Sequence, residues 1–204
     1  MNLVDDLIEL RREIHRHPEL AGEERETAGL VSTTSGLSEH HECVTPGRYS
    51  RSMVERLRLA KIDRDNVAAA CRLAVRPDQD SFVAPVAVSL AEAYAQPDVA
   101  WPRLVYDGDE LVGFVMGGFD PDSPIPFFRC GIWRLNIAAE QQGKGYGRFA
   151  ACAVLDEARR RGQRRATVLW VPGSGGPEGF YLKLGFKPTG EQFHGQIVGE
   201  ISLD

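Results

Sequence analysis

The first fifty residues follow a different hydrophobic pattern from the rest of the chain. Apolar residues at helical spacing among charged ones predict an amphipathic helix over residues 3–16, which His17-Pro18 would end. A second short helix is expected over 22–31. Residues 32–52 are rich in Ser, Thr, Gly and His and have no apolar period, which is typical of a linker. The sequence thus predicts a helical appendage at 1–31, a linker at 32–52 and a main domain at 53–204.

The main domain alternates between the hydrophobic periods of strands and helices. Strands are predicted at 54–62, 102–106, 110–118, 127–138, 165–171, 186–190 and 195–203. Helices are predicted at 66–75, 85–95 and 145–161, with a short one that opens at Pro177. Asp63 is the expected N-cap of the first of these, and Asp107-Gly108-Asp109 is an expected hairpin turn. The order predicts an α/β fold in which helices cover the faces of one sheet.

Composition and charge narrow the class of protein. Of the 204 residues, 43% are hydrophobic and 26% are charged, which is the balance of a folded globular protein. The net charge of −5 belongs to the first 50 residues, because acidic and basic side chains are equal in number in the remainder. Without a basic excess or a long apolar run, neither a nucleic-acid partner nor a membrane partner is expected. The absence of a signal-peptide pattern at the start favours a cytoplasmic location.

A glycine-rich stretch carries most of the chemical information. It reads Gln142-Gly-Lys-Gly-Tyr-Gly-Arg148 and lies between a predicted strand and a predicted helix. Glycines at alternate positions let successive backbone N–H groups face one point at a helix N-terminus, where they bind phosphate together with the helix dipole. Lys144 and Arg148 add positive charge. The stretch predicts a site for a phosphate-bearing ligand.

Other glycine motifs fit this stretch less well. A glycine-rich turn without a ligand is the simplest alternative. The P-loop pattern GxxxxGK[ST] is absent, and a Rossmann turn requires an acidic residue on the following strand, which the chain lacks. The spacing that fits is Gln-x-x-Gly-x-Gly, from Gln142 to Gly147.

This spacing resembles the acetyl-CoA motif of the GNAT superfamily of N-acetyltransferases. Leu135-Asn136-Ile137 lies where that family's central strand pairs with pantetheine, and Gly179-Phe-Tyr-Leu-Lys-Leu-Gly-Phe186 matches its Leu-Tyr-x-Lys-x-Gly-Phe element. The resemblance spans roughly residues 54–204. It implies a GNAT-type mixed, mostly antiparallel central sheet flanked by helices, with acetyl-CoA as co-substrate. The implied cofactor-binding residues are Leu135, Asn136, Ile137, Gln142, Gly143, Lys144, Gly145, Tyr146, Gly147, Arg148 and Ser174.

The resemblance also implies a reaction, the direct attack of a primary amine on the acetyl thioester. The N–H of Ile137 or its neighbour is expected to stabilise the developing oxyanion, and Tyr181 is expected to protonate the leaving thiolate as general acid. Segments 82–94, 111–116, 171–181 and 188–191 resemble the diamine (spermidine-type) acetyltransferases, which implies a polyamine acceptor. Two alternatives stay open: Tyr181 as a core aromatic residue, and a non-catalytic module that binds acetyl-CoA as a regulatory signal.

Two positions depart from the family pattern. Trp133 stands where many amine-acetylating relatives carry Asp or Glu, and Ser174 stands where an Asn often contacts CoA. Substitute bases would have to come from residues that are better explained as surface groups: Glu191, Glu178, Asp107, Asp120 and His194. The general base and the acceptor are left open.

The appendage has a resemblance of its own. Residues 10–28 resemble the opening helix of zinc-dependent amidohydrolases of the aminoacylase type. The downstream His-x-Asp ligands of that family are missing, the four cysteines have no paired spacing, and His40-His41 with Cys43 lacks a fourth ligand. No metal is expected. The segment is interpreted as a remnant or docking element, and a homodimer is compatible with it.

Overall fold

The computed structural model of the chain describes residues 55–204. The helices expected at 3–16 and 22–31 and the linker expected at 32–52 lie outside the described residues. The division of the chain into appendage, linker and main domain therefore stays a prediction.

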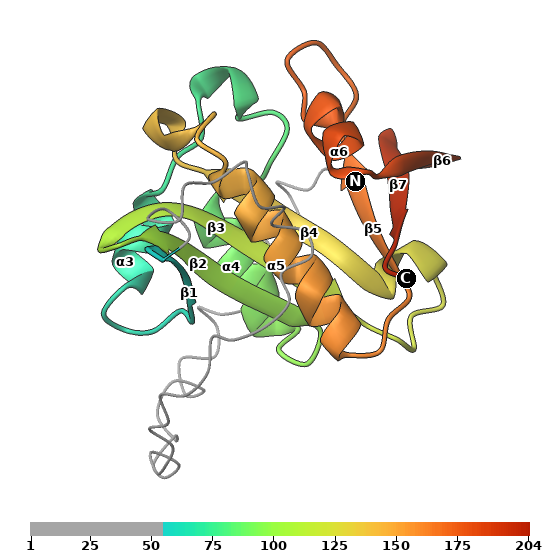
Figure 1. The fold of residues 1–204 in the computed structure, drawn as a ribbon, viewed down its shortest axis with the longest axis horizontal. Helices are drawn as coiled ribbons and strands as arrows, with labels where there is room; N and C mark the ends of the chain where they lie inside the picture. The colour runs from blue at the N-terminus through green and yellow to red at the C-terminus, as the bar shows by residue number, and fades with distance from the viewer. Residues whose placement is uncertain (1–54) are drawn as a thin grey trace, which may run out of the picture. The chain divides into compact units, whose positions relative to one another are not determined.

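Seven strands form one sheet in the order β1-β2-β3-β4-β5-β7-β6 (Figure 1). All neighbouring pairs are antiparallel except β4 and β5, which are parallel. The prediction of a mixed, mostly antiparallel sheet is confirmed. The strands are β1 (Leu57–Ala60), β2 (Ala100–Asp107), β3 (Glu110–Phe119), β4 (Cys130–Ile137), β5 (Arg165–Trp170), β6 (Lys187–Phe193) and β7 (Gln196–Ser202).

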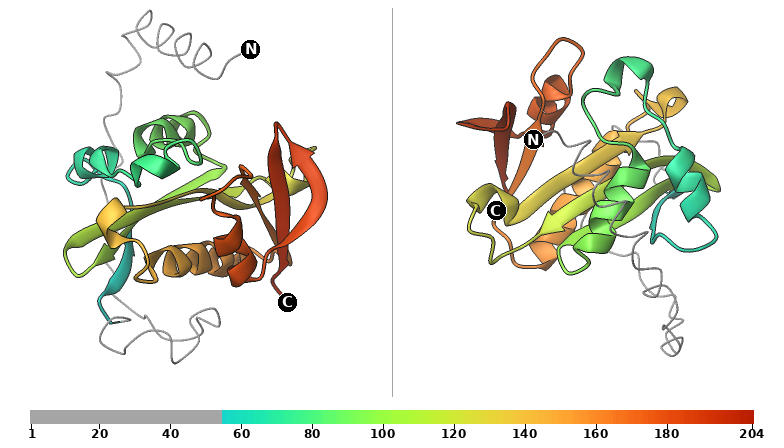
Figure 2. Two further views of the ribbon diagram at one scale, coloured as in Figure 1. Left: turned by 90° about the horizontal axis from the view of Figure 1, so that it is seen from above. Right: turned by 180° about the vertical axis from the view of Figure 1, so that it is seen from behind.

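Helices cover both faces of the sheet (Figure 2). The α4 face carries α3 (Val67–Arg72) and α4 (Val86–Ala95), and the α5 face carries α5 (Tyr146–Arg160) and α6 (Glu178–Leu184). Each face has its own buried cluster, with Phe114 and Met116 in the first and Val115 and Val154 in the second. None of the helices in the described part is long and apolar enough to cross a membrane.

Two local predictions are wrong for identifiable reasons. The N-cap of α3 is Asn66, whereas Asp63 accepts backbone N–H bonds of 2.9 and 3.0 Å from Asp65 and Asn66 in the turn before the helix. The strand expected at 127–138 begins only at Cys130, because Pro126–Phe128 forms a 3₁₀ turn. Proline has no N–H for a strand ladder and its fixed φ suits the first position of a helical turn.

Candidate functional site

The parallel strands β4 and β5 pair over a short distance and then diverge. Their register joins only Gly131 to Thr167 and Ile132 to Val168. A Cβ on residue 131 would lie 2.1 Å from the backbone oxygen of Thr167, so the close approach requires glycine there. Beyond Ile132 the strands separate, as Figure 1 shows. The rest of β4 therefore has one edge without strand pairing.

A β-bulge at Trp133 changes which side chains β4 presents to each face. Arg134 pairs with Met116 and Ile132 pairs with Gly117, so Trp133 is an extra residue on this strand. Ile132 before the bulge and Leu135 after it both pack against the cluster on the α5 face. Trp133 packs against the cluster on the α4 face, and Arg134 reaches that side as well. The bulge thus places two consecutive side chains on the α4 face.

The glycine turn leads directly into the longest helix. Gly143 and Gly145 have φ of 79° and 97°, which side chains rarely tolerate. Helix α5 begins at Tyr146 with Gly145 as its N-cap, and the first amides of a helix lack partners within it. Gly147 has a different role, because a Cβ there would lie 3.3 Å from the Phe180 ring of α6. The turn presents the positive end of a 15-residue helix to solvent.

Side chains of the turn make contacts that the sequence did not reveal. Gln142 Nε2 donates to the Ile137 carbonyl at 3.1 Å and to Gln79 Oε1 at 2.7 Å. Lys144 Nζ donates to Gln141 Oε1 at 2.8 Å and is exposed. Gln142 therefore closes the turn onto the end of β4 and ties it to the loop before α4.

The side chain of Tyr146 points into the protein. It is buried, and its hydroxyl donates a 2.7 Å hydrogen bond to Asp107 at the end of β2. Arg56 also holds this carboxylate, with 2.8 Å between Nε and Oδ1. The hydrogen bond to Asp107, followed by burial, raises the pKa of Tyr146 to about 12. A cofactor could contact only the backbone of Tyr146, and Asp107 is occupied as an ion-pair partner.

Tyr181 lies on α6 within an aromatic cluster. Its ring stacks on Trp170 at a centroid distance of 5.7 Å and meets Phe180 and Phe186 edge-on. Burial raises the pKa of Tyr181, so the phenol stays protonated at neutral pH. None of the described residues forms a hydrogen bond with this hydroxyl. The aromatic contacts fix the ring, and the hydroxyl proton is not donated to any of the described residues.

The residues around the diverging strands fit a phosphate-bearing, extended ligand such as acetyl-CoA. Among the described residues, Trp170 Nε1 at the end of β5 and Arg148 Nε in the first turn of α5 are buried donors without a partner. Buried donors are rarely left unsatisfied, so their presence here favours a polar ligand. The position of a Cβ on Gly143 is open space, which leaves room beside the turn.

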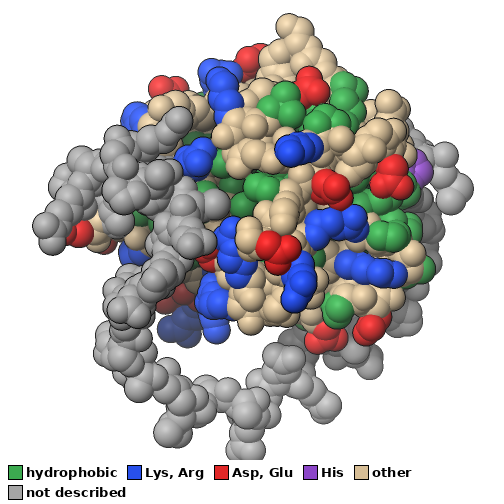
Figure 3. All heavy atoms as spheres, turned by 45° about the vertical axis from the view of Figure 1, so that its right-hand side comes forward, with side chains coloured by type: hydrophobic (Ala, Val, Ile, Leu, Met, Phe, Trp, Pro, Cys, Tyr) green, Lys and Arg blue, Asp and Glu red, His purple; other side chains and the backbone are tan. Residues whose placement is uncertain are grey.

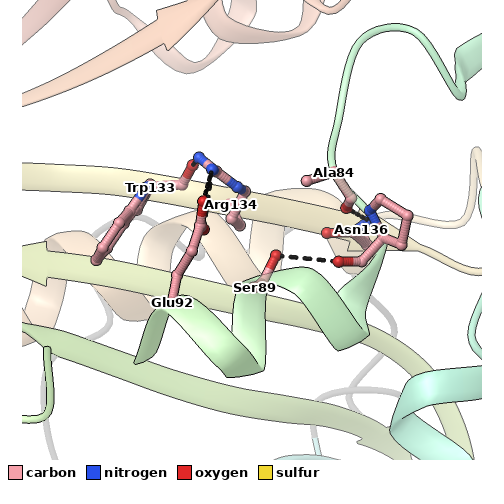
Figure 4. Close-up of polar contacts among 7 residues, drawn as sticks. Ala84, Ser89, Glu92, Trp133, Arg134 and Asn136 are labelled. Carbon is pink, nitrogen blue, oxygen red and sulfur yellow. Dashed lines mark hydrogen bonds and ion pairs between the residues drawn. The ribbon is translucent and has the colours of Figure 1, made fainter. Parts of the chain in front are cut away.

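The α4 face of β4 carries a second group of polar side chains (Figure 4). Arg134 Nη2 lies 2.9 Å from both carboxylate oxygens of Glu92 on α4. Asn136 is 2% exposed and its Nδ2 donates to the Ala84 carbonyl at 3.0 Å. Arg134 Nε and Asn136 Oδ1 are buried without partners among the described residues. The carboxylate of Glu92 lies near Trp133, but it comes from α4 and is paired with Arg134.

Several other residues that the sequence singled out are exposed at the surface. Ser174 is exposed in the loop after β5, and Glu191 and His194 are exposed on the β6–β7 hairpin. Within residues 55–204, no three His, Cys, Asp or Glu side chains form a group that could hold a metal. Figure 3 shows one face on which basic and acidic side chains are interspersed, without a large region of one sign.

Sequence reasoning missed Trp170, Glu92 and Gln79 as parts of this region. Alternation along β5 places Trp170 in the core, but no local pattern marks its indole N–H as unpaired. Glu92 lies 42 residues from Arg134, and Gln79 lies 63 residues from Gln142. Only the folded sheet brings these pairs together.

Comparison with known proteins defines the family. The sequence model of the Acetyltransferase (GNAT) family matches residues 81–186, which include α4, the glycine turn and α6. The chain belongs to the GNAT acetyltransferase family, as the motif had predicted. No curated protein matches the sequence.

Solved structures of low sequence identity share the fold. The PaiA N-acetyltransferase of Thermoplasma acidophilum, in complex with coenzyme A, is 13% identical with a TM-score of 0.55, over 72% of this chain and 98% of that one. An acetyltransferase of Salmonella typhimurium that modifies the N-terminal serine of a 50S ribosomal subunit protein is 16% identical with a TM-score of 0.57, over 73% and 96%. The N-acetylglutamate synthase of Neisseria gonorrhoeae, complexed with coenzyme A and N-acetyl-glutamate, is 14% identical with a TM-score of 0.55, over 72% and 35%.

Proposed function

We propose that the chain transfers the acetyl group of acetyl-CoA to a primary amine, with a polyamine as the acceptor class and Tyr181 as general acid. The family assignment supports the reaction type. The observation that carries the proposal is the combination of two features beside the diverging strands. The glycine turn at the start of α5 offers a phosphate site, and Tyr181 stacks on Trp170 at the end of β5 with its proton available.

Each part of the site would have a defined role. The first amides of α5, with Lys144 and Arg148, would hold the phosphates, and the free edge of β4 at residues 135–137 would hold the pantetheine arm. When bound, acetyl-CoA supplies the acetyl thioester. The N–H of Ile137 would donate to the carbonyl oxygen as charge develops on it. The attacking amine would lose its proton to water, and the Tyr181 hydroxyl would deliver a proton to the departing sulfur. Burial raises the pKa of Tyr181, so the phenol is protonated at neutral pH and holds the proton to be transferred.

The polyamine class rests on sequence resemblance in the segment that forms α4 and in the loop before α6. The experiment is a thiol-release assay with acetyl-CoA and a panel of spermidine, putrescine, an aminoglycoside and a Lys peptide. We expect thiol release that depends on a primary amine, with the acetylated amine identified by mass spectrometry. Binding of acetyl-CoA without turnover of any acceptor would instead favour the non-catalytic regulatory module.

A further inference from the structure

The orientation of the Asn136 side chain is fixed by its surroundings. Its Nδ2 donates to the Ala84 carbonyl at 3.0 Å (Figure 4). The flipped amide would bring two carbonyl oxygens together, so the nitrogen must face Ala84 and the oxygen must face away. Asn136 Oδ1 is thereby held as a buried acceptor without a donor among the described residues. Such an atom is poorly tolerated unless a ligand or water supplies the donor.

The other groups nearby on the α4 face of β4 are either already paired or are donors. Glu92 is bound through both oxygens by Arg134, and the guanidinium of Arg134 has only donors. Trp133 offers an indole N–H, which is also a donor. Asn136 Oδ1 is therefore the unsatisfied acceptor that this part of β4 presents to the α4 face. It lies on the residue next to Ile137, whose N–H is assigned to the acetyl carbonyl in the proposed function.

We propose that Asn136 Oδ1 accepts a hydrogen bond from the N–H of the acceptor amine and orients that amine for attack. This inference rests on the proposed function, because it assumes that an amine attacks the acetyl thioester held beside Ile137. It places that amine on the α4 face of β4, the opposite side of the strand from α5 and Tyr181. A carboxamide oxygen orients an amine without taking its proton. Asn136 would therefore orient the amine, but it would not act as the base that a strand carboxylate at the position of Trp133 could provide.

The test compares two cationic probes with the same butyl chain, one with N–H donors and one in which methyl groups replace them. These are n-butylamine, the fragment common to putrescine, spermidine and the Lys side chain, and butyltrimethylammonium, which has no N–H. Binding of each to the CoA-saturated protein is measured by calorimetry for the wild type, for Asn136→Leu and for Ser89→Ala. Ser89→Ala is the matched control, because Ser89 donates to the Pro85 carbonyl in the same segment that Asn136 anchors.

We expect the wild type and Ser89→Ala to prefer n-butylamine over the quaternary probe by about tenfold, the effect of one hydrogen bond. In Asn136→Leu the preference should disappear while CoA affinity and the circular dichroism spectrum are unchanged. A preference that survives in Asn136→Leu, or no preference in the wild type, would overturn the proposal. If Asn136→Leu does not fold, Asn136→Ala is measured in the same way. Failure of the proposed function is seen separately, as absence of thiol release by the wild type with every amine.

Discussion

The hydroxyl of Tyr146 donates a 2.7 Å hydrogen bond to Asp107, which joins the first residue of α5 to the last residue of β2. Asp107 is also held by Arg56, just before β1. The glycine turn is thus followed by a helix whose first residue is bonded to β2. In the strand order, β2 lies on the other side of β4 from β5. This contact positions the amides that the proposed function assigns to phosphate.

Removal of the Tyr146 hydroxyl should destabilise the fold. Tyr146→Phe keeps the ring in the core but leaves Asp107 without one of its donors. A hydrogen bond to a charged acceptor contributes about 2 kcal/mol, and we expect a loss of that size in the free energy of unfolding. Urea unfolding monitored by circular dichroism measures it. The matched control is Tyr94→Phe at an 82% exposed position, which should be neutral. Equal stability of the two variants would contradict the prediction.

The same contact should make stability depend on pH in the alkaline range. The pKa of Tyr146 is raised to about 12 by the bond to Asp107, against about 10 for an unfolded tyrosine. The protonated phenol therefore stabilises the fold fully below pH 10, and this stabilisation is lost as the pH rises from 10 towards 12. The difference between the wild type and Tyr146→Phe should be constant near pH 8 and smaller at pH 11. A difference that grows with pH would show that the sign is wrong.

Tyr181 should affect turnover and leave cofactor binding intact. Tyr181→Phe keeps the stacking on Trp170 and removes only the proton donor. We expect kcat to fall on the order of 10²-fold, with CoA affinity and thermal unfolding close to those of the wild type. Because burial raises the pKa of Tyr181, the wild type should keep its proton donor to above pH 10. Wild-type kcat in Tyr181→Phe would return this residue to a purely structural role.

The phosphate site can be tested with a control that carries the same added charge at another turn. Gly145→Asp would place a carboxylate at the N-terminus of α5, in the path of the pyrophosphate. Gly108→Asp introduces the same charge at another glycine of positive φ, 61° against 97°, in the turn between β2 and β3. Calorimetry should show a loss of CoA affinity of tenfold or more for Gly145→Asp alone. Similar losses in both variants would point to general damage to the fold.

Local patterns were sufficient to predict the order of the elements in the described part of the chain. Helix α5 follows from its apolar spacing and from the glycines before it, and the hairpin of β2 and β3 follows from Asp107-Gly108-Asp109. The bulge at Trp133 was not predictable, because an extra residue in one strand depends on the register with β3. For the same reason the sequence could not show that Trp133 and Arg134, which are consecutive, share a face.

The sequence predicted only part of the candidate site, for a related reason. The glycine turn is local, since it consists of consecutive residues with special backbone angles. The partners of its side chains are distant in sequence: Tyr146 meets Asp107 and Gln142 meets Gln79. These contacts depend on how the strands are arranged in the sheet, and they fix both side chains within the protein.

Residues 1–50 should be dispensable for chemistry, whereas β1 should not be. The glycine turn, Tyr181 and Asn136 make all of their contacts cited above within residues 79–186, and Tyr146 depends on Arg56 only through Asp107. A chain that begins at Ser52 keeps Arg56 and β1, and we expect it to fold and to match the full chain in kcat and CoA affinity.

A chain that begins at Lys61 lacks both Arg56 and β1, which exposes one edge of β2 and leaves Asp107 with Tyr146 alone. It should unfold at lower urea concentration and bind CoA more weakly. Circular dichroism, light scattering and the thiol-release assay compare the three proteins. If the chain that begins at Ser52 is folded but inactive with every acceptor of the full chain, the appendage contributes to the active site and the domain division is wrong.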